Sequence, residues 1–310
     1  MNVNKIGFVY NYHKEQGLWR THLMAPAPIL FGDDKIRIYV GGWDINGISR
    51  IYYIDVKRDD PSIVTNICTE PVLEIGNDGC FDDNGVFPAH AYKFDNDKVW
   101  LYYTGFQKLD KIPFSNFSGL AISNDGGETF TRYSKAPVLD RQDEGLYTRA
   151  GISAIPAKGG GFHCVYNAGT GWCFVNGKNR PIYDVFYQYS KDGINFNREG
   201  TKIVRCNLEV EHGLGRPQII ELGEYTYVFY TRRIIKDMRY FMGATRTKDY
   251  VTWERCDDLF ENVDYGDKGE FDCDMIYFPA AVKVAPDKAY LFYCGNHYGE
   301  DGIGYIELTW

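Results

Sequence analysis

A short run of aromatic and β-branched residues occurs five times along this chain at an almost constant interval, and this repeat limits the possible folds more than any other feature. The runs start at or beside five residues that lie 63, 64, 63 and 63 positions apart, namely Lys35, Lys98, Phe162, Tyr225 and Lys288. Five units of about 63 residues fill nearly all of the 310 positions. The sequence therefore predicts one repeat domain over residues 1–310.

Each unit carries the pattern of four short strands. The first strand contains a proline, the second is the aromatic run, the third follows a turn and the fourth is the weakest. In the first unit these strands are marked by Pro26, Ile36–Val40, Ser49–Ile54 and Pro71–Leu73. Four antiparallel strands per repeat are typical of a propeller blade, whereas helical repeats show a period of about 3.6 residues and solenoids have shorter units. We therefore predict an all-β fold, a five-bladed β-propeller with four antiparallel strands per blade.

The repeat also predicts how the ring closes. The expected blades are approximately 20–73, 82–139, 148–205, 212–262 and 274–310. The last unit ends after three strands, and the N-terminal run 4–10 is expected to supply the fourth. Pairing of the two ends would close the ring and remove exposed strand edges.

Composition excludes several classes of protein. The net charge is −8, which argues against a nucleic-acid partner because phosphate contacts normally need a basic face. The N-terminus lacks an apolar signal core and no 18-residue apolar segment occurs, so we expect no membrane span and a cytoplasmic location. The eight cysteines form no CxxC pair and are expected to be reduced thiols, with no metal site and no cofactor.

Strand direction assigns the loops to two faces. Loops that enter a first strand, and loops that join a second strand to a third, should lie on one face, which we call the functional face. The third-to-fourth turns should lie on the other. There Ser123–Phe130 matches the Asp-box pattern S-x-D-x-G-x-T-[W/F], and Ser190–Phe196 and Thr247–Trp253 resemble it. An aspartate in such a turn bonds its own backbone, so these segments are expected to staple turns and not to catalyse.

Ionisable residues recur at equivalent positions on the functional face. Alignment of the repeats on their first-strand prolines places five residues at one position: Thr21, Asp83, Arg149, His212 and Asp274. Beside them lie Arg20, His22, Asp82, Thr148, Glu211, Asp272 and Arg216. We interpret this ring as an active site; the alternative is a set of ion pairs that satisfy one another around a wet channel.

Aromatic and basic residues follow the second strands on the same face. They include Trp43 with Asp44, residues 106–114, Trp172, Arg232 with Arg233, and His297 with Tyr298. Aromatic rings around a polar centre suit a sugar, whose C–H faces can stack while its hydroxyl groups bond carboxylates. Each aromatic residue taken alone could instead serve packing.

Motifs along the whole chain resemble the five-bladed propeller glycosidases, the fold shared by glycoside hydrolase families 43, 32, 62, 68 and 130. The motifs are Phe81–Pro88, Leu101–Gly105, Ser190–Ile194, Gly215–Pro217 and Gly295–Gly299. They are characteristic of the architecture and specify the substrate poorly. Propellers of this kind occur in the gene sets that build bacterial surface polysaccharides.

The resemblance implies three acidic residues at the starts of the inner strands. The matching positions are Asp83 as base or nucleophile, Glu211 as general acid and Asp274 as the orienting carboxylate. In such a site the acid is kept protonated by burial or like charge while its partner stays ionised. The first unit has Thr21 and His22 where family 43 places its base, so either the blade register is rotated or the chemistry differs.

The basic residues of the functional face predict an anionic substrate, because guanidinium forks suit phosphate or carboxylate groups. An anionic sugar, a nucleotide sugar or inorganic phosphate would fit. The expected substrate-binding residues are His22, Trp43, Asp82, Arg149, Trp172, His212, Arg216, Arg232, Asp272 and His297. The alternative is that each arginine pairs with a nearby acid.

The sequence thus predicts a carbohydrate-active enzyme that cleaves or transfers a glycosidic bond with paired carboxylates at the propeller axis. Three alternatives remain open. One is a phosphorylase or glycosyltransferase that uses the arginine cluster for phosphate, and another is a non-catalytic propeller that binds glycans. A sialidase-like propeller is the third, although such proteins usually have six blades.

Overall fold

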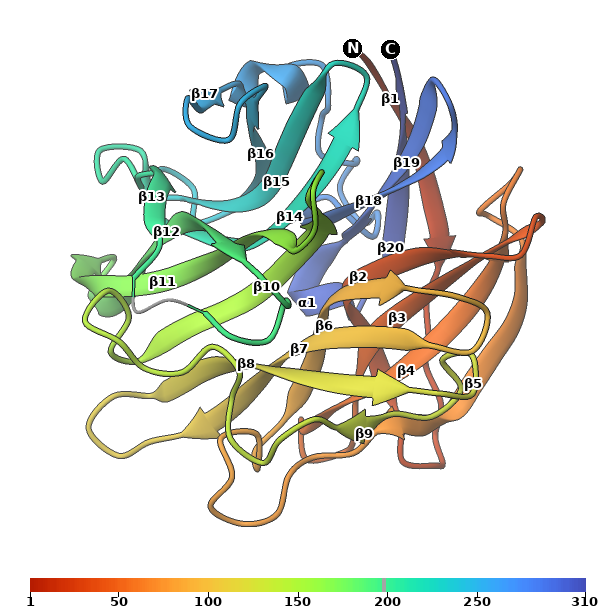
Figure 1. The fold of residues 1–310 in the computed structure, drawn as a ribbon, viewed down its shortest axis with the longest axis horizontal. Helices are drawn as coiled ribbons and strands as arrows, with labels where there is room; N and C mark the ends of the chain where they lie inside the picture. The colour runs from red at the N-terminus through yellow and green to blue at the C-terminus, as the bar shows by residue number, and fades with distance from the viewer. Residues whose placement is uncertain (197–198) are drawn as a thin grey trace.

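The computed structural model, which describes residues 1–196 and 199–310, is built almost wholly of β-strands (Figure 1). The first strands in order are β1 (Asn2–Tyr10), β2 (Thr21–Phe31), β3 (Lys35–Trp43), β4 (Ser49–Lys57), β5 (Val64–Leu73), β6 (Val86–Lys93), β7 (Val99–Lys108), β8 (Phe114–Ser123), β9 (Thr131–Arg132) and β10 (Thr148–Pro156). The next are β11 (Phe162–Val175), β12 (Lys178–Ser190), β13 (Thr201–Val204), β14 (Glu211–Leu222), β15 (Tyr225–Ile234), β16 (Tyr240–Thr247) and β17 (Glu254–Arg255). A 3-10 turn (Asp257–Phe260), β18 (Tyr277–Ala285), β19 (Lys288–Cys294), the short turn α1 (Asn296–Gly299) and β20 (Ile303–Thr309) complete the described elements.

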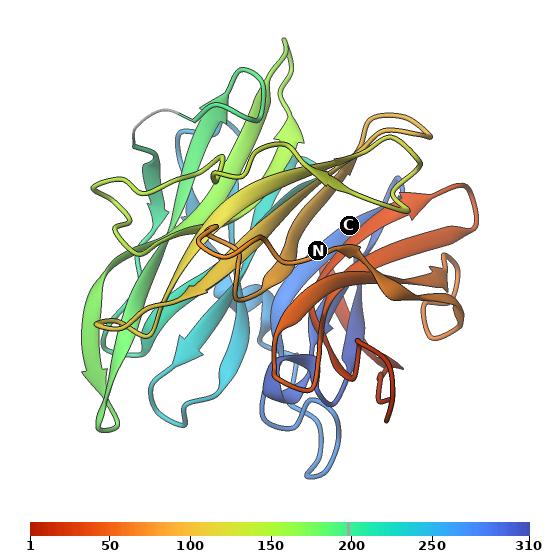
Figure 2. The same cartoon turned by 90° about the horizontal axis from the view of Figure 1, so that it is seen from below.

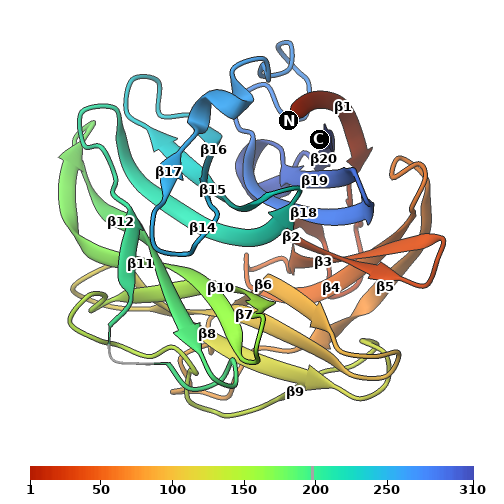
Figure 3. The same cartoon turned by 45° about the horizontal axis from the view of Figure 1, so that its top comes forward.

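The strands pair with their sequence neighbours in antiparallel groups of four. Two sheets have the orders β2-β3-β4-β5 and β14-β15-β16-β17, and a third has the order β1-β20-β19-β18. The fourth sheet has eight strands because β8 and β10 also pair in parallel, through Asn116 with Thr148 and Phe117 with Arg149. The sheets stand around a common centre toward which β2, β6, β10, β14 and β18 converge (Figure 3). The architecture is therefore all-β and propeller-like.

The N-terminal strand completes the last sheet. β1 pairs antiparallel with β20 from Asn2 opposite Thr309 to Tyr10 opposite Ile303, which confirms the prediction made for residues 4–10. The two chain ends accordingly lie side by side (Figures 1 and 2). Among the described residues, no helix is long and apolar enough to cross a membrane.

The apolar core lies between neighbouring sheets. One cluster joins Ile38 and Tyr52 of the first sheet to Phe292 and Tyr305 of the last. Each of these four side chains is buried, so alternate positions of the aromatic runs face a neighbouring sheet and hold the ring together.

A tyrosine closes the aromatic run of four of the five units and bonds a carboxylate. The hydroxyl-to-oxygen distances are 3.1 Å for Tyr103 to Asp82, 2.5 Å for Tyr166 to Glu144, 2.8 Å for Tyr230 to Asp257 and 2.8 Å for Tyr293 to Asp272. In three units a glycine of the next strand makes room for the ring, since a Cβ on Gly119, Gly243 or Gly304 would lie within 2.6 Å of tyrosine atoms. The repeat therefore carries a buried tyrosine–carboxylate bond that the strand pattern alone does not reveal.

The innermost strands are bulged near their prolines. The register shifts between Met24 and Ala27 in β2, and equivalent shifts occur in β6, β10, β14 and β18. Three residues that precede a proline are left-handed, with φ of 57° at Ala25, 45° at Arg216 and 54° at Phe278. Such a backbone costs a non-glycine residue about 1–3 kcal/mol and is concentrated at functional sites. The bulges turn peptide carbonyl groups toward the axis.

The three Asp-box-like segments staple turns, as predicted. The Asp125 carboxylate accepts hydrogen bonds from the Ser123 hydroxyl and from the backbone N–H groups of Glu128 and Thr129. Although burial acts to raise it, these bonds lower the pKa of Asp125 to about 2. Asp192 and Asp249 accept equivalent bonds in their own turns.

These turns predict a loss of stability in acid. A carboxylate whose pKa is depressed by folding stabilises the protein above its unfolded pKa of about 3.9 and loses that contribution as the pH falls through its folded pKa. The pKa is about 2 for both Asp125 and Asp192, so the melting temperature should fall between about pH 4 and pH 2. The variant Asp125→Asn with Asp192→Asn should show a shallower fall in a thermal melt series. Identical pH profiles for the two proteins would contradict this assignment.

Candidate functional site

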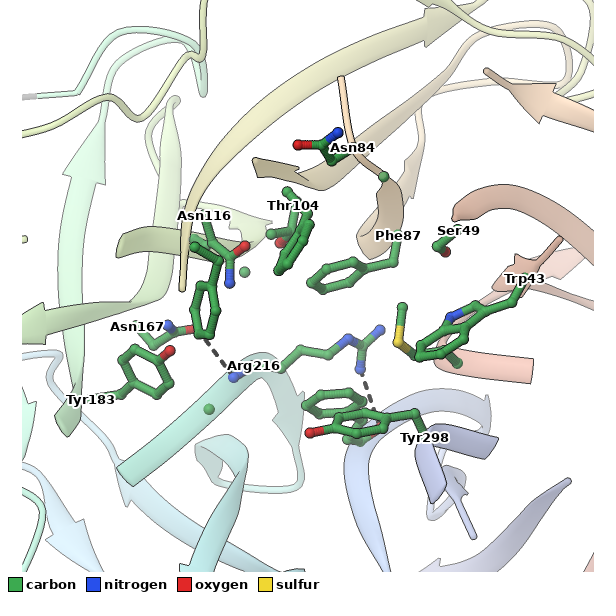
Figure 4. Close-up of a pocket in the computed structure, with 18 of the residues that line it drawn as sticks. Trp43, Ser49, Asn84, Phe87, Thr104, Asn116, Asn167, Tyr183, Arg216 and Tyr298 are labelled. Atoms are coloured by element: carbon green, nitrogen blue, oxygen red, sulfur yellow. Dashed lines mark hydrogen bonds between the residues drawn. The ribbon is translucent and has the colours of Figure 1, made fainter. Parts of the chain in front are cut away.

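A cavity of about 270 Å³ opens at the centre of the ring, on the functional face. It lies where inner strands begin, where second strands end and where third strands start (Figure 4). Aromatic side chains form much of the wall: Trp43, Phe87, Phe106, Phe114, Tyr183, Phe278 and Tyr298. Polar groups come from Ser49, Asn84, Thr104, Asn116, Asn167, Lys108, Arg216 and Arg233. No aspartate or glutamate is among the described residues that line it.

Arg216 lies at the cavity floor and joins the inner strands. It follows Gly215 in β14, and its buried guanidinium donates hydrogen bonds to carbonyl oxygens of β2, β6 and β18. The acceptors are Pro26 at 2.6 Å, Ala25 at 2.9 Å, Phe278 at 3.2 Å, and Pro88 and Ala89 at 3.3 Å. Burial lowers the pKa of Arg216 to about 10, so the side chain stays charged at neutral pH. The bulged strands thus create an acceptor ring for one guanidinium.

Arg233 borders the same cavity, but its guanidinium has different neighbours from that of Arg216. It extends from β15, and its guanidinium carbon lies 4.7 Å from the ring centre of Tyr183 and 5.4 Å from that of Tyr240. Its Nε atom is buried without a hydrogen-bond partner. Among the described residues no carboxylate forms an ion pair with Arg233. The guanidinium of Arg233 therefore packs against the faces of tyrosine rings.

Trp43 forms one wall and is held by a histidine. The Trp43 ring stacks on His22 with centroids 3.9 Å apart, and Tyr298 lies 6.2 Å from Trp43 on the cavity side. His22 is buried, which lowers its pKa to about 4, so its ring is neutral at pH 7. His22, His297 and Tyr298 have φ of 71°, 52° and 63°, so left-handed backbone positions support this wall.

None of the three predicted catalytic acids is among the described residues that line the cavity. Glu211 is fully buried and accepts bonds from Arg232 at 2.8 Å and from Arg255 at 2.8 Å and 2.9 Å. Asp274 is exposed. Asp83 lies directly before the cavity residue Asn84, and its Oδ2 accepts bonds from the Gly79 N–H at 2.9 Å and from Gln107 at 3.4 Å. Its Oδ1 is buried and has no hydrogen-bond partner.

The predicted binding residues divide into two groups. Trp43 and Arg216 line the cavity. Most of the others form ion pairs or packing contacts outside it: Asp82 with Arg132, Arg149 with Glu144, Arg232 with Glu211, Asp272 with Lys5, Trp172 with Tyr147, His22 with Trp43, and the exposed His297 with Asp301. These contacts are the arrangement that the ion-pair alternative expects.

His212 is the remaining predicted residue. It is buried, and neither ring nitrogen has a hydrogen-bond partner. Burial, followed by the charges of Arg233 and Arg180, lowers its pKa to about 4. A neutral imidazole therefore lies behind the cation that borders the cavity.

The sequence placed Arg233 and Tyr298 on the functional face but did not single them out as binding residues, and it gave no indication that Tyr183 lines the site. Strand alternation offers a signal for Arg233, because neighbouring residues of a strand point to opposite sides. Arg232 points to the Glu211 ion pair, so its neighbour Arg233 points the other way, to the cavity. Nothing comparable marks Tyr298, whose position depends on a left-handed turn.

Comparisons with known proteins give the fold a context. No family model matches the chain. A Mycobacterium tuberculosis protein called "Uncharacterized protein Rv1502" is 26% identical over 309 residues, which are 99% of both chains. A solved structure described as "Glycoside hydrolase" has a TM-score of 0.71 at 18% identity and covers 98% of this chain and 91% of its own. A beta-1,2-mannobiose phosphorylase from Listeria innocua has a TM-score of 0.71 at 10% identity, covering 100% and 97%. The chain therefore has the fold of the propeller-like glycosidases.

Proposed function

We propose that this protein is a carbohydrate-active enzyme that breaks or transfers a glycosidic bond in the central cavity. The observation that carries the proposal is the cavity itself, a hollow at the centre of the ring with aromatic walls and amide, hydroxyl and cationic groups between them. Sugar sites combine apolar walls with a few placed polar groups. The solved structures of similar fold that are described as a glycoside hydrolase and a phosphorylase support this reading.

We also propose that the fold is a five-bladed propeller. The count treats β6–β9 and β10–β13 as two blades that touch through the parallel pairing of β8 with β10. Each blade then matches one unit of about 63 residues. A role in cytoplasmic polysaccharide metabolism is a further part of the proposal, and it rests on the family resemblance alone.

The cavity favours a small and anionic substrate. Its volume of about 270 Å³ lies just below the range for ligand pockets, about 300–1,000 Å³, which suits one terminal sugar unit. Lys108, Arg216 and Arg233 line it, and no acid among the described residues does. An anionic sugar, including a nucleotide-linked one, or inorganic phosphate would balance this charge.

The chemistry that fits best uses a single acid. Hydrolysis normally needs two carboxyl groups on either side of the bond, whereas phosphorolysis needs one acid because phosphate is the nucleophile. We assign the acid to Asp83, since it directly precedes the cavity residue Asn84 and one of its oxygens is buried and unpaired. A phosphate oxygen would bond the anomeric carbon, the glycosidic C–O bond would break, and the Asp83 proton would pass to the leaving oxygen.

The proposal is tested by incubating the protein with a panel of oligosaccharides, with and without inorganic phosphate, and analysing the mixtures by mass spectrometry. We expect a product one sugar unit shorter than the substrate, with a sugar phosphate when phosphate is present. Release of the free sugar at the same rate without phosphate would replace phosphorolysis by hydrolysis. Unchanged substrates throughout would contradict an enzyme.

A glycan-binding protein without catalysis is the second candidate. It is favoured by one observation, the lack of any acid among the described lining residues. Calorimetry that found tight binding of an intact oligosaccharide, with no product after long incubation, would select this candidate over the enzyme.

Trp43 should contribute strongly to sugar affinity in either case. Replacement of a buried aromatic anchor by alanine typically costs 2 kcal/mol or more, so Trp43→Ala should weaken binding by about 30-fold. Isothermal titration calorimetry measures the change, and Tyr133→Ala, which removes an aromatic ring that is 51% exposed, is the control. An equal loss in both variants, or none in Trp43→Ala, would contradict the assignment.

A further inference from the structure

Two arginines border the cavity, and the protein supplies hydrogen-bond acceptors for the guanidinium of only one of them. The Arg216 guanidinium is surrounded by five carbonyl acceptors. Arg233 has tyrosine faces beside it, an unpartnered buried Nε and no acid among the described residues that line the cavity. An arginine remains protonated in any such setting. Arg216 therefore has a structural role, whereas the positive charge of Arg233 is not balanced by an acidic residue.

A hydroxyl group without a partner lies beside Arg233. Tyr183 lines the cavity and is 3% exposed, and its hydroxyl lies near Arg233 and Thr148 without forming a hydrogen bond of normal geometry to either. It extends from β12, whereas Arg233 extends from β15, so two blades contribute donors to one corner. A buried polar group without a partner costs about 1–3 kcal/mol, and such groups in native structures call for a functional explanation. A ligand that accepts hydrogen bonds would supply both missing partners.

The balance of charge indicates what kind of ligand. Lys108 is exposed at the rim and can be balanced by solvent ions, and the Arg216 charge is met by carbonyl dipoles. One fixed and uncompensated guanidinium remains, which matches a single negative charge. A carboxylate has that charge and accepts a bidentate bond from a guanidinium fork, whereas phosphate carries nearly two charges at neutral pH.

We propose that the Arg233–Tyr183 corner binds a carboxylate carried by the sugar itself, so that the substrate is a uronic acid or another sugar acid. This inference rests on the proposed function and names the substrate class of the same cavity. Figure 4 shows Tyr183 and Trp43 on opposite sides of Arg216. The sugar ring therefore lies against the Trp43 wall and directs its acid group toward Tyr183 and Arg233.

Calorimetric titrations with glucuronic and galacturonic acid, with glucose and galactose, and with inorganic phosphate test this inference at pH 7. We expect at least one sugar acid to bind tenfold or more tightly than its neutral counterpart. Arg233→Met should abolish that difference, because it should weaken binding of the sugar acid much more than binding of the neutral sugar. Tyr183→Phe, which removes only the hydroxyl group, should reduce the difference by a smaller factor.

Two controls make the result specific. Arg246→Met removes a partly exposed arginine of β16 that pairs with Glu254 of the edge strand β17, outside the residues that line the cavity, and it should leave all affinities unchanged. Thermal melts should show Arg233→Met to be as stable as the parent protein or more stable, because it removes a cation that the protein does not compensate. A fall in melting temperature with Arg233→Met would indicate a structural role and overturn the inference.

The outcomes separate this inference from the proposed function. If neutral sugars bind as tightly as sugar acids, the carboxylate subsite is wrong while the carbohydrate site survives. If phosphate binds more tightly than the sugar acids and depends on Arg233, the corner is an inorganic phosphate site and the inference is also wrong. If none of the sugars binds, both the inference and the carbohydrate function fail.

Discussion

Replacing Asp83 with asparagine should lower the rate of glycosidic bond cleavage by about 10²- to 10⁴-fold, the usual contribution of a positioned general acid. The amide has nearly the same shape as the carboxylic acid and cannot donate a catalytic proton. Asp83 forms no ion pair among the described residues, and its Oδ1 is buried without a hydrogen-bond partner. The variant should therefore keep the melting temperature of the parent protein.

A neighbouring residue offers a matched control for Asp83. Asp78 is exposed in the same loop, and Asp78→Asn should retain full activity. The measurement is product formation followed by mass spectrometry, with a thermal melt of each variant. Full activity of Asp83→Asn would remove Asp83 from the mechanism, and a large fall in its melting temperature would show that the residue serves the fold.

The Arg216→Met variant should be destabilised by about 3–5 kcal/mol, the typical cost of removing one partner from a buried charged network. The change leaves five inward carbonyl groups of β2, β6 and β18 without their donor. The bulged strands hold these groups at the axis, where they have little else to bond. Urea unfolding monitored by tryptophan fluorescence measures the loss.

Two further variants show whether that loss of stability comes from the charge of Arg216 or from the geometry of its hydrogen bonds. Arg216→Lys keeps the charge and offers three donors in place of the planar fork, so it should recover only part of the stability. Arg246→Met, at a partly exposed position, should lie within about 0.5 kcal/mol of the parent. An Arg216→Met protein that unfolds at the urea concentration of the parent would show that the axis does not depend on this guanidinium.

Much of the fold could be predicted because the residues of the second strands form a repeating sequence pattern. The aromatic runs at Lys35, Lys98, Phe162, Tyr225 and Lys288 mark real second strands, and the N-terminal run pairs with β20. The joining of β8 to β10 could not be predicted. It rests on two residue pairs, which is too short a contact to leave a periodic signal in the sequence.

The site was predicted less completely, because a repeat position fixes where a residue lies and not what its side chain contacts. Trp43 and Arg216 were identified and do line the cavity. Glu211 was found at the start of an inner strand, but its carboxylate turns toward Arg232 and Arg255. Asp82 and Asp272 likewise bond Tyr103 and Tyr293 at the ends of the aromatic runs.

For Asp82 and Asp272, the structural reason is the tyrosine that closes the aromatic run of their units. Each such tyrosine needs a buried acceptor, and an acid near the entry to the inner strand can supply it. Acids near the axis can therefore be explained by the fold before catalysis is considered. Asp83 is distinct because it has neither a tyrosine nor an arginine as its partner among the described residues.

The most direct test of the central claim is a crystal structure of the protein soaked with an oligosaccharide that ends in a uronic acid. The account predicts density for the terminal sugar inside the cavity, with its ring against Trp43, its carboxylate at Arg233 and Tyr183, and its glycosidic oxygen toward Asp83. Well-ordered sugar bound only on the outer strands or on the opposite face, with an empty cavity, would contradict the account.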